Sequence, residues 1–400
     1  MTQSLSQRAH DIEEWAEKHF LDSRGIVYTY IRTDTEGPLT DDFFSPDQEP
    51  LCAPICTPAE WHNYENCTMA TAAYMLGLLY RYTVEKDPIA LERARRSYHA
   101  LKHIYDMGKQ LEEGFMPKTY GARFSEETSS DQVLYAMMAL DYFYQYADAS
   151  EKADAKRMIV NMIGFWMKRG YRYRYFWEED MLWPLGRFTA LLLMGYKYSG
   201  DEAFKKEYDR LLEMGVNKEP LESRLLPKLK PDYQPMPYEI EHNAWLLSEI
   251  DGAISMDMTE LDYLLRNDPA NVWAKHWKRS AQFMWEEGKL ALAPDGTQYV
   301  HVLVDMDTRK PRQPDPGFFK QIEKGEGGMD KWIGWSYVTG ARSCDSTFIA
   351  RSAVMANTHF HDPEMVASAK HVLSAIDCKG MRSYYDPDRH LPELRHRTDL

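Results

Sequence analysis

Three kinds of side chain that suit carbohydrate chemistry recur at corresponding places along this chain. Carboxylates occur at the predicted first turns of apolar helices, and aromatic rings and arginines occur there and in the preceding connections. Carboxylates transfer protons, rings stack on sugars, and a guanidinium binds a carboxylate through two parallel hydrogen bonds. The pattern indicates a site for a sugar.

The candidate catalytic groups are three carboxylates and one imidazole: Asp131, Glu65, His242 and Asp345. Asp131 lies in a predicted first turn, where the helix dipole favours any acid. Glu65 lies past the first turn of an apolar helix and is harder to explain as a surface residue. His242 can instead be a hydrogen-bonded core histidine, and Asp345 can be an N-cap. We expect Asp131 to be the acid/base and one of the others to be its partner.

The candidate substrate-binding groups are mainly aromatic, amide and basic. The rings are expected to stack on sugars, and the two arginines either hold a carboxylate or form salt bridges that fix loops. Glu178 belongs to an acidic run that a solvated loop would also explain. The set comprises Trp61, His62, Tyr120, Arg123, Gln132, Trp177, Glu178, Asn243, Trp335 and Arg342.

The elements that must position these groups are pairs of helices. Thr57-Pro58-Ala59-Glu60 is a capping box with a first-turn proline, and it predicts an apolar helix that continues to about Val84. Ser129 to Gln132 forms a second capping box. Further apolar helices are expected over about 185–198, from near Glu239 to about Ile254, and over about 345–358. Amphipathic helices are expected over about 6–21, 88–108, 150–169, 202–214, 269–287 and 363–376.

The connections between these helices are lopsided. Those that precede an apolar helix are long, over about 22–56, 109–128, 170–183, 215–238 and 288–343, whereas most of the others are short. Hairpins closed in a ring would place the N-termini of parallel inner helices on the long-loop side, where backbone N–H groups favour anionic ligands. We therefore predict an all-α (α/α)6-type barrel forming a single domain over residues 1–400, with a small β-hairpin around Gln298 to Asp305. An open solenoid is the alternative.

The composition of the chain limits the kinds of ligand and the cell compartment that we expect. The formal charge of −14 disfavours nucleic acid, although local arginines can still serve a small anionic substrate. No apolar run approaches the roughly 20 residues of a membrane span. Five cysteines and no secretory leader at Met1 indicate reduced thiols and a cytoplasmic protein. Neither a metal-ligand spacing nor a nucleotide-binding motif stands out, so no metal or cofactor is expected.

Three segments carry a resemblance to a known family. Tyr64-Glu65-Asn66, Gly114-Phe115-Met116-Pro117-Lys118-x-Tyr120-Gly121 and Ser130-Asp131-Gln132-x-x-Tyr135, together with the alternating helices, resemble the six-hairpin glycosidase superfamily. Within it the chain looks most like unsaturated-glucuronyl hydrolases and β-glucuronidase-like proteins. The resemblance implies action on uronic-acid-containing oligosaccharides. It also implies an aspartate, matched here by Asp131, that protonates a vinyl ether and activates water.

The expected function is thus glycoside hydrolysis of short uronate-containing oligosaccharides. A polysaccharide lyase is the enzymatic alternative, and there Tyr120 or His242 would be the base that removes the proton next to the uronate. A non-catalytic helical-repeat protein that binds carbohydrate or serves as a scaffold is the third alternative.

Overall fold

A computed structural model describes most of the N-terminal half of the chain and parts of the remainder. The described residues are 4–32, 35–43, 56–175, 178–183, 185–214, 250–289, 303–304, 311–312, 355, 358–367, 370 and 397–399. They form two compact units. Residues 13–183, 191–209 and 399–400 make up one, which we call the hairpin unit, and residues 1–12, 184–190 and 210–398 make up the C-terminal unit.

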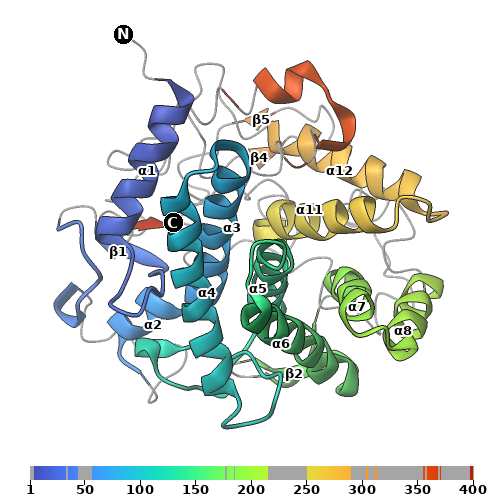
Figure 1. Ribbon diagram of the computed structural model, residues 1–400, viewed down its shortest axis with the longest axis horizontal. Helices are drawn as coiled ribbons and strands as arrows, with labels where there is room; N and C mark the ends of the chain where they lie inside the picture. The colour runs from blue at the N-terminus through green and yellow to red at the C-terminus, as the bar shows by residue number, and fades with distance from the viewer. Residues whose placement is uncertain are drawn as a thin grey trace. The chain divides into compact units, whose positions relative to one another are not determined.

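The hairpin unit is built from consecutive helical pairs, as the sequence predicted. Each pair joins an apolar helix to an amphipathic one, and the first two pairs pack side by side (Figure 1). The helices are α3 (Cys67–Glu85) with α4 (Pro88–Gly108), α5 (Ser130–Phe143) with α6 (Ala149–Lys168), and α7 (Leu185–Ser199) with α8 (Glu202–Glu213). In the last pair, residues 185–190 and 210–213 belong to the C-terminal unit. The fold is therefore all-α with short strands.

The apolar helices α3 and α5 run parallel, because they touch at both ends. At their C-terminal ends the rings of Tyr80 and Tyr142 lie 4.8 Å apart, and Thr83 Oγ1 is 2.6 Å from the hydroxyl of Tyr146. At their N-terminal ends Gln132 of α5 hydrogen-bonds Asn66 and Met69. Parallel inner helices bring their N-termini to the same end of the unit, and this is what the ring hypothesis requires of them.

The outer helices α4 and α6 are joined by ion pairs rather than by apolar packing alone. Arg95 Nε lies 3.2 Å from Glu151 Oε1, and Lys102 Nζ lies 3.6 Å from Asp154 Oδ2. In the connection after α4, Glu112 accepts from Lys168, the last residue of α6, at 3.0 Å. These contacts follow from the amphipathic pattern, which places charges on the face away from α3 and α5.

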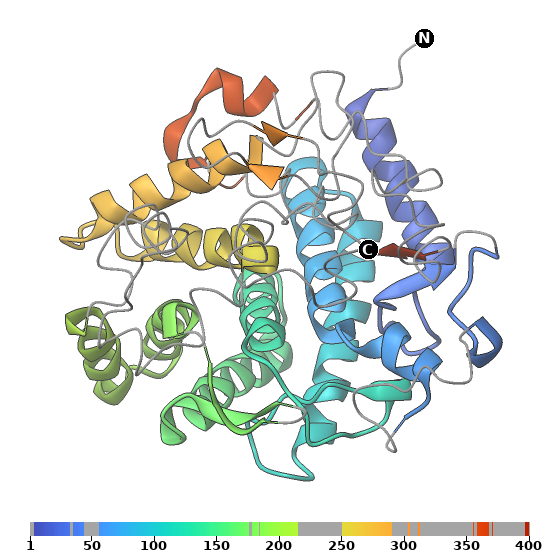
Figure 2. The same cartoon turned by 180° about the vertical axis from the view of Figure 1, so that it is seen from behind.

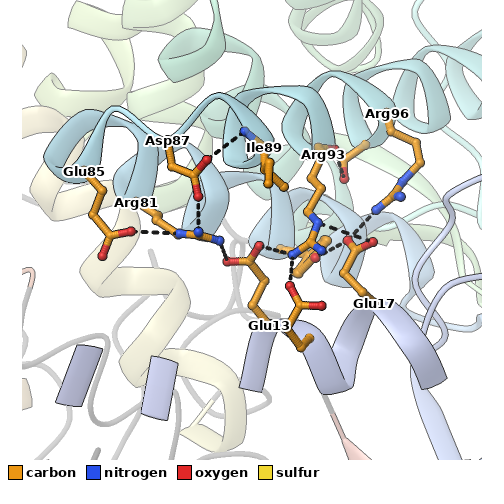
Figure 3. A network of polar contacts seen from close by, with 11 residues as sticks. Glu13, Glu17, Arg81, Glu85, Asp87, Ile89, Arg93 and Arg96 are labelled. Atoms are coloured by element: carbon orange, nitrogen blue, oxygen red, sulfur yellow. Dashed lines mark hydrogen bonds and ion pairs between the residues drawn. The ribbon is translucent and has the colours of Figure 1, made fainter. Parts of the chain in front are cut away.

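Residues 13–19 of α1 (Leu5–His19) are bound to the α3–α4 hairpin through a charged network (Figure 3). Glu13 accepts from Arg81 Nη1 of α3 and Arg93 Nη1 of α4, each at 2.5 Å. Glu17 accepts from Arg96 and from the hydroxyl of Tyr74. The network adds charged contacts to the apolar packing of Trp15, which lies against the cluster that contains Phe20 and Ala70.

The connections are lopsided, as predicted. Short turns link α3 to α4 and α7 to α8, whereas the connection before α5 spans residues 109–129 and holds η2 (Tyr120–Ala122). The connection before α7 was expected to be a loop, and this was wrong: it forms the antiparallel pair β2 (Arg172–Tyr175) and β3 (Glu178–Leu182). The strand pair lies beside the C-terminal end of α6 (Figure 2). Tyr173 of β2 packs its ring 5.5 Å from Phe165 and 6.2 Å from Trp166.

The C-terminal unit contains α11 (Ile250–Asn267) packed against α12 (Ala274–Lys289). The sequence predicted a connection after Ile254, but the helix continues to Asn267. Its continuation is anchored by Asp262, which is buried and accepts from Arg266 Nη2 at 2.7 Å and His359 Nε2 at 2.9 Å. Arg266 is one helical turn from Asp262, whereas His359 is far along the chain and cannot be predicted from local periodicity.

The predicted small β-hairpin is present. β4 (Leu303–Val304) pairs antiparallel with β5 (Pro311–Arg312), and Leu303 faces Arg312. A further short strand, β6 (Arg397–Asp399), lies near the end of the chain. The helix predicted from near Glu239 lies outside the described residues up to 249, and so does most of 345–358; closure of the hairpins into a ring therefore stays a prediction.

Candidate functional site

The candidate site lies at the N-terminal ends of α3 and α5. A short helix, α2 (Pro58–Tyr64), leads into α3, and residues 114–123 of the long connection pass beside both. Thr57 and Glu60 form the predicted capping box of α2. The sequence predicted one helix from there to Val84, and this was wrong, because the helix breaks at Glu65 and Asn66.

Thr29, from the segment that leads into β1 (Tyr30–Arg32), explains the break. Its backbone N–H donates to the carbonyl of Asn63 at 2.8 Å, and its Oγ1 accepts the N–H of Asn66 at 2.9 Å. Both groups would otherwise serve the helix ladder. The helix is therefore interrupted by a residue more than thirty positions earlier in the chain. The same region holds η1 (Asp41–Phe43), where Asp41 accepts the N–H of Ala59 at 3.1 Å.

A buried ion pair occupies the break. Lys118 Nζ donates to a carboxylate oxygen of Glu65 and also to the carbonyl of Glu65 at 3.2 Å. The two side chains are 1% and 11% exposed. Burial alone would lower the pKa of Lys118, but the negative charge of Glu65 outweighs burial, Asp131 adds to it, and the pKa lies above its usual value. The ammonium therefore stays protonated, 5.9 Å from the ring centroid of Tyr175.

Asp131 and Gln132 lie in the first turn of α5. Asp131 is half-buried, and its Oδ2 accepts from Gln132 Nε2 at 3.2 Å. The fully buried Gln132 also donates to Asn66 Oδ1 at 2.7 Å and accepts the N–H of Met69 at 3.0 Å. The side chain predicted to complete a capping box for α5 thus caps α3 instead, and Ser129 makes no side-chain cap of its own.

Two aromatic residues flank the ion pair. Tyr120 is 1% exposed and packs with Cys56 and Trp61 in one cluster. Burial raises the pKa of Tyr120, and Glu65 and Glu127 add to this against the opposing charge of Lys118. Burial likewise raises the pKa of Tyr175 to about 12. Both phenols are therefore protonated at neutral pH and can act as hydrogen-bond donors.

Two other candidates lie at the edge of this cluster. Arg123 is 59% exposed, and its Nη2 lies 2.6 Å from Glu60 Oε2. The ring of His62 lies 4.6 Å from that of Trp61 and 6.0 Å from that of Tyr30. The structure thus brings together Asp131, Gln132, Glu65, Tyr120 and Trp61, with Arg123 and His62 nearby.

The remaining candidates lie outside the described residues. They are Trp177, His242, Asn243, Trp335, Arg342 and Asp345. Glu178 lies at the start of β3, and its side chain is not among those described. The sequence did not predict a role for Lys118, although this residue lies inside one of the segments that carry the family resemblance. A lysine in a long connection has no periodicity that would indicate burial.

The two described cysteines, Cys56 and Cys67, differ in their oxidation state. Cys67 is buried, with Sγ 3.1 Å from Thr119 Oγ1, and burial raises its pKa to about 11. Cys56 is disulfide-bonded, which differs from the expectation of reduced thiols. Within the described part of the chain no cluster of three or more histidine, cysteine or carboxylate side chains is placed to hold a metal. No helix there is both long and apolar enough to cross a membrane.

Comparisons with known proteins leave the family open. Neither a family model nor a curated protein sequence matches the chain. A crystal structure of D-mannose isomerase is similar to this structure at a TM-score of 0.46 and 10% sequence identity, over 92% of this chain and 84% of that one. A likeness of this strength supports no assignment of activity.

Proposed function

We propose that the chain is a carbohydrate-active enzyme that hydrolyses short uronic-acid-containing oligosaccharides, with Asp131 as the general acid/base. The observation that carries the proposal is the setting of Asp131. Asp131 is half-buried in the first turn of an inner helix, and its carboxylate accepts a hydrogen bond from Gln132 at 3.2 Å. Its negative charge also contributes to the raised pKa of the buried Lys118. A positioned carboxylate beside aromatic side chains is suited to proton transfer to a sugar.

The residues around Asp131 have separate roles in this proposal. Gln132 bridges Asn66 and Asp131 and thereby fixes the direction of the carboxylate. Glu65 is bound to Lys118, so it positions the lysine and does not carry the transferred proton. In the reaction implied by the family resemblance, Asp131 protonates the vinyl ether of an unsaturated uronate and then takes a proton from the water that adds to it.

The properties of Tyr120 weigh against the lyase alternative. A base that starts β-elimination must accept a proton, whereas burial raises the pKa of Tyr120 and keeps its phenol protonated. His242, the other base named for that reaction, lies outside the described residues. We therefore place the lyase second.

The first prediction concerns turnover. Asp131→Asn should lower kcat for an unsaturated glucuronyl disaccharide by about 10²- to 10⁴-fold, because the amide cannot transfer the proton. The measurement is the loss of ultraviolet absorbance as the double bond is consumed. Asp141→Asn is the matched control, since Asp141 lies near the other end of α5, where it binds Lys197 at 2.6 Å; it should keep normal turnover per folded molecule.

Other outcomes would separate the alternatives. New absorbance from a saturated uronate polymer would show a lyase. No turnover of either substrate, with retained binding of the sugar, would show a carbohydrate-binding protein. Unchanged turnover in Asp131→Asn would remove the role that we give to Asp131.

A further inference from the structure

Two buried polar atoms in the cluster around Tyr120 lack a hydrogen-bond partner among the described residues. They are the hydroxyl of Tyr120 and the Nε1–H of Trp61, for which the described structure provides no hydrogen-bond partner. The two side chains pack in the same cluster, one from η2 and the other from α2. Leaving a buried donor unpaired costs the desolvation of that group, and native proteins seldom do so without a reason.

The packing around these atoms is close. Gly121, which follows Tyr120, has a φ of +56°, and a Cβ there would lie 2.6 Å from Glu60 Oε1 of α2. The left-handed φ favours glycine at this position, and a larger side chain would have to displace the end of the Glu60 side chain. The tight approach of η2 to α2 keeps Tyr120 and Trp61 in one cluster.

The chemistry of the pair selects the ligand. An indole N–H is only a donor, and a protonated phenol donates readily. A carboxylate only accepts hydrogen bonds and has two oxygens, so it satisfies both donors without an unpaired proton of its own. A sugar hydroxyl, in contrast, would need an acceptor for its proton. The charge of Lys118 is balanced by Glu65, so the ion pair adds no net charge, and the preference for a carboxylate comes from the two donors.

We propose that Trp61 and Tyr120 together form a carboxylate-binding subsite that holds the uronate group of the sugar through Trp61 Nε1–H and Tyr120 O–H. The proposal rests on the proposed function and specifies how its substrate class is recognised. It replaces Arg123 in that role, because Arg123 is 59% exposed and already paired with Glu60. It also changes the expected contribution of both rings from stacking to hydrogen bonding.

The test compares binding with stability. Calorimetric titration with D-glucuronate should show that Tyr120→Phe weakens binding about 10- to 100-fold, the range expected for one hydrogen bond to a charged group. Trp61→Phe should weaken it as well. D-glucose, which lacks the carboxylate, should bind the wild type more weakly and should be little affected by Tyr120→Phe.

Thermal unfolding without ligand supplies the second readout. Tyr120→Phe should unfold at the same temperature as the wild type or higher, because it removes an unpaired buried hydroxyl. Tyr105→Phe is the matched control: Tyr105 is equally buried, but its hydroxyl donates to Glu113 at 2.6 Å and accepts from Asn161 at 3.2 Å. That variant should unfold at a lower temperature and bind D-glucuronate normally.

Three outcomes would overturn the subsite. They are no binding of D-glucuronate by the wild type, equal binding by Tyr120→Phe and the wild type, and a fall in unfolding temperature for Tyr120→Phe that matches the fall for Tyr105→Phe. The last outcome would show that the hydroxyl of Tyr120 is hydrogen-bonded in the free protein, to a buried water. Binding is measured without turnover, so normal activity of Asp131→Asn would refute the proposed acid/base and leave the subsite standing.

Discussion

At the scale of single residues, the Lys118–Glu65 pair is the most consequential feature of the site. Lys118→Met should lower the free energy of unfolding by about 3–5 kcal/mol, because it leaves the carboxylate of Glu65 buried without a counter-charge. The variant that also carries Glu65→Gln should be less destabilised than Lys118→Met alone. Urea unfolding measures both, and equal stabilities for the two variants would show that Glu65 reaches solvent when Lys118 is absent.

A second residue-scale prediction concerns pH. Burial alone would raise the pKa of Asp262, but the hydrogen bond from His359 and the charge of Arg266 outweigh it, and the pKa is lowered. The stability that Asp262 contributes is therefore present above the unfolded-state pKa, about 4, and is lost as pH falls through the lower folded-state value. The difference in unfolding free energy between the wild type and Asp262→Asn should shrink below about pH 4. A difference that stays constant from pH 7 to pH 3 would contradict this.

At the scale of elements, the N-terminus of α3 depends on the neighbouring helix. Gln132→Ala should cost about 1–3 kcal/mol of unfolding free energy, since it removes the acceptor for the Met69 N–H and the donor to Asn66. Ser129→Ala is the control, because the Ser129 side chain makes no cap bond; it should change stability by less than about 0.5 kcal/mol. A larger loss of stability in Ser129→Ala than in Gln132→Ala would contradict this and would support the capping box that the sequence predicted at Ser129.

The same helix ends show how far local sequence predicts structure. The capping box at Thr57 was predicted correctly, because its donor and acceptor lie within four residues. The one at Ser129 was not, because Gln132 has better partners on α3. The break between α2 and α3 could not be predicted either, since Thr29 causes it from a distant segment. Local patterns thus located the helices but not the contacts between them.

At the scale of the molecule, periodicity was enough to predict the alternation of apolar and amphipathic helices and the side that carries the long connections. This alternation placed Asp131, Gln132, Glu65, Tyr120 and Trp61 at one end of the hairpin unit, where the structure has them. Lys118 could not be predicted because its burial is created by partners from the break between α2 and α3 and from β2. The sequence thus predicts which residues gather at the site more readily than which charged side chains are buried there.

The charged network around Glu13 also joins elements that are far apart in sequence (Figure 3). Arg81 binds Glu13, Glu85 and Asp87, and the other oxygen of Asp87 caps α4 through the N–H of Ile89 at 2.9 Å. One carboxylate thus serves a helix terminus and an arginine that reaches α1. Removing Glu13 should therefore loosen α1 and leave Arg81 and Arg93 with fewer partners.

Glu13→Gln should lower the free energy of unfolding by about 1–3 kcal/mol, because its side chain is 10% exposed and binds two arginines. Glu14→Gln is the matched control. Glu14 binds the same Arg93 at 2.6 Å but is 64% exposed, so solvent screens the pair and the change should stay below about 0.5 kcal/mol. Urea unfolding in 0.1 M and 1 M salt measures both losses of unfolding free energy. The loss in Glu13→Gln should be similar at the two salt concentrations, whereas any loss in Glu14→Gln should vanish in 1 M salt, because salt screens exposed charges more than buried ones. Equal losses of stability in the two variants would mean that apolar packing holds α1 in place and that the charged network contributes little to stability.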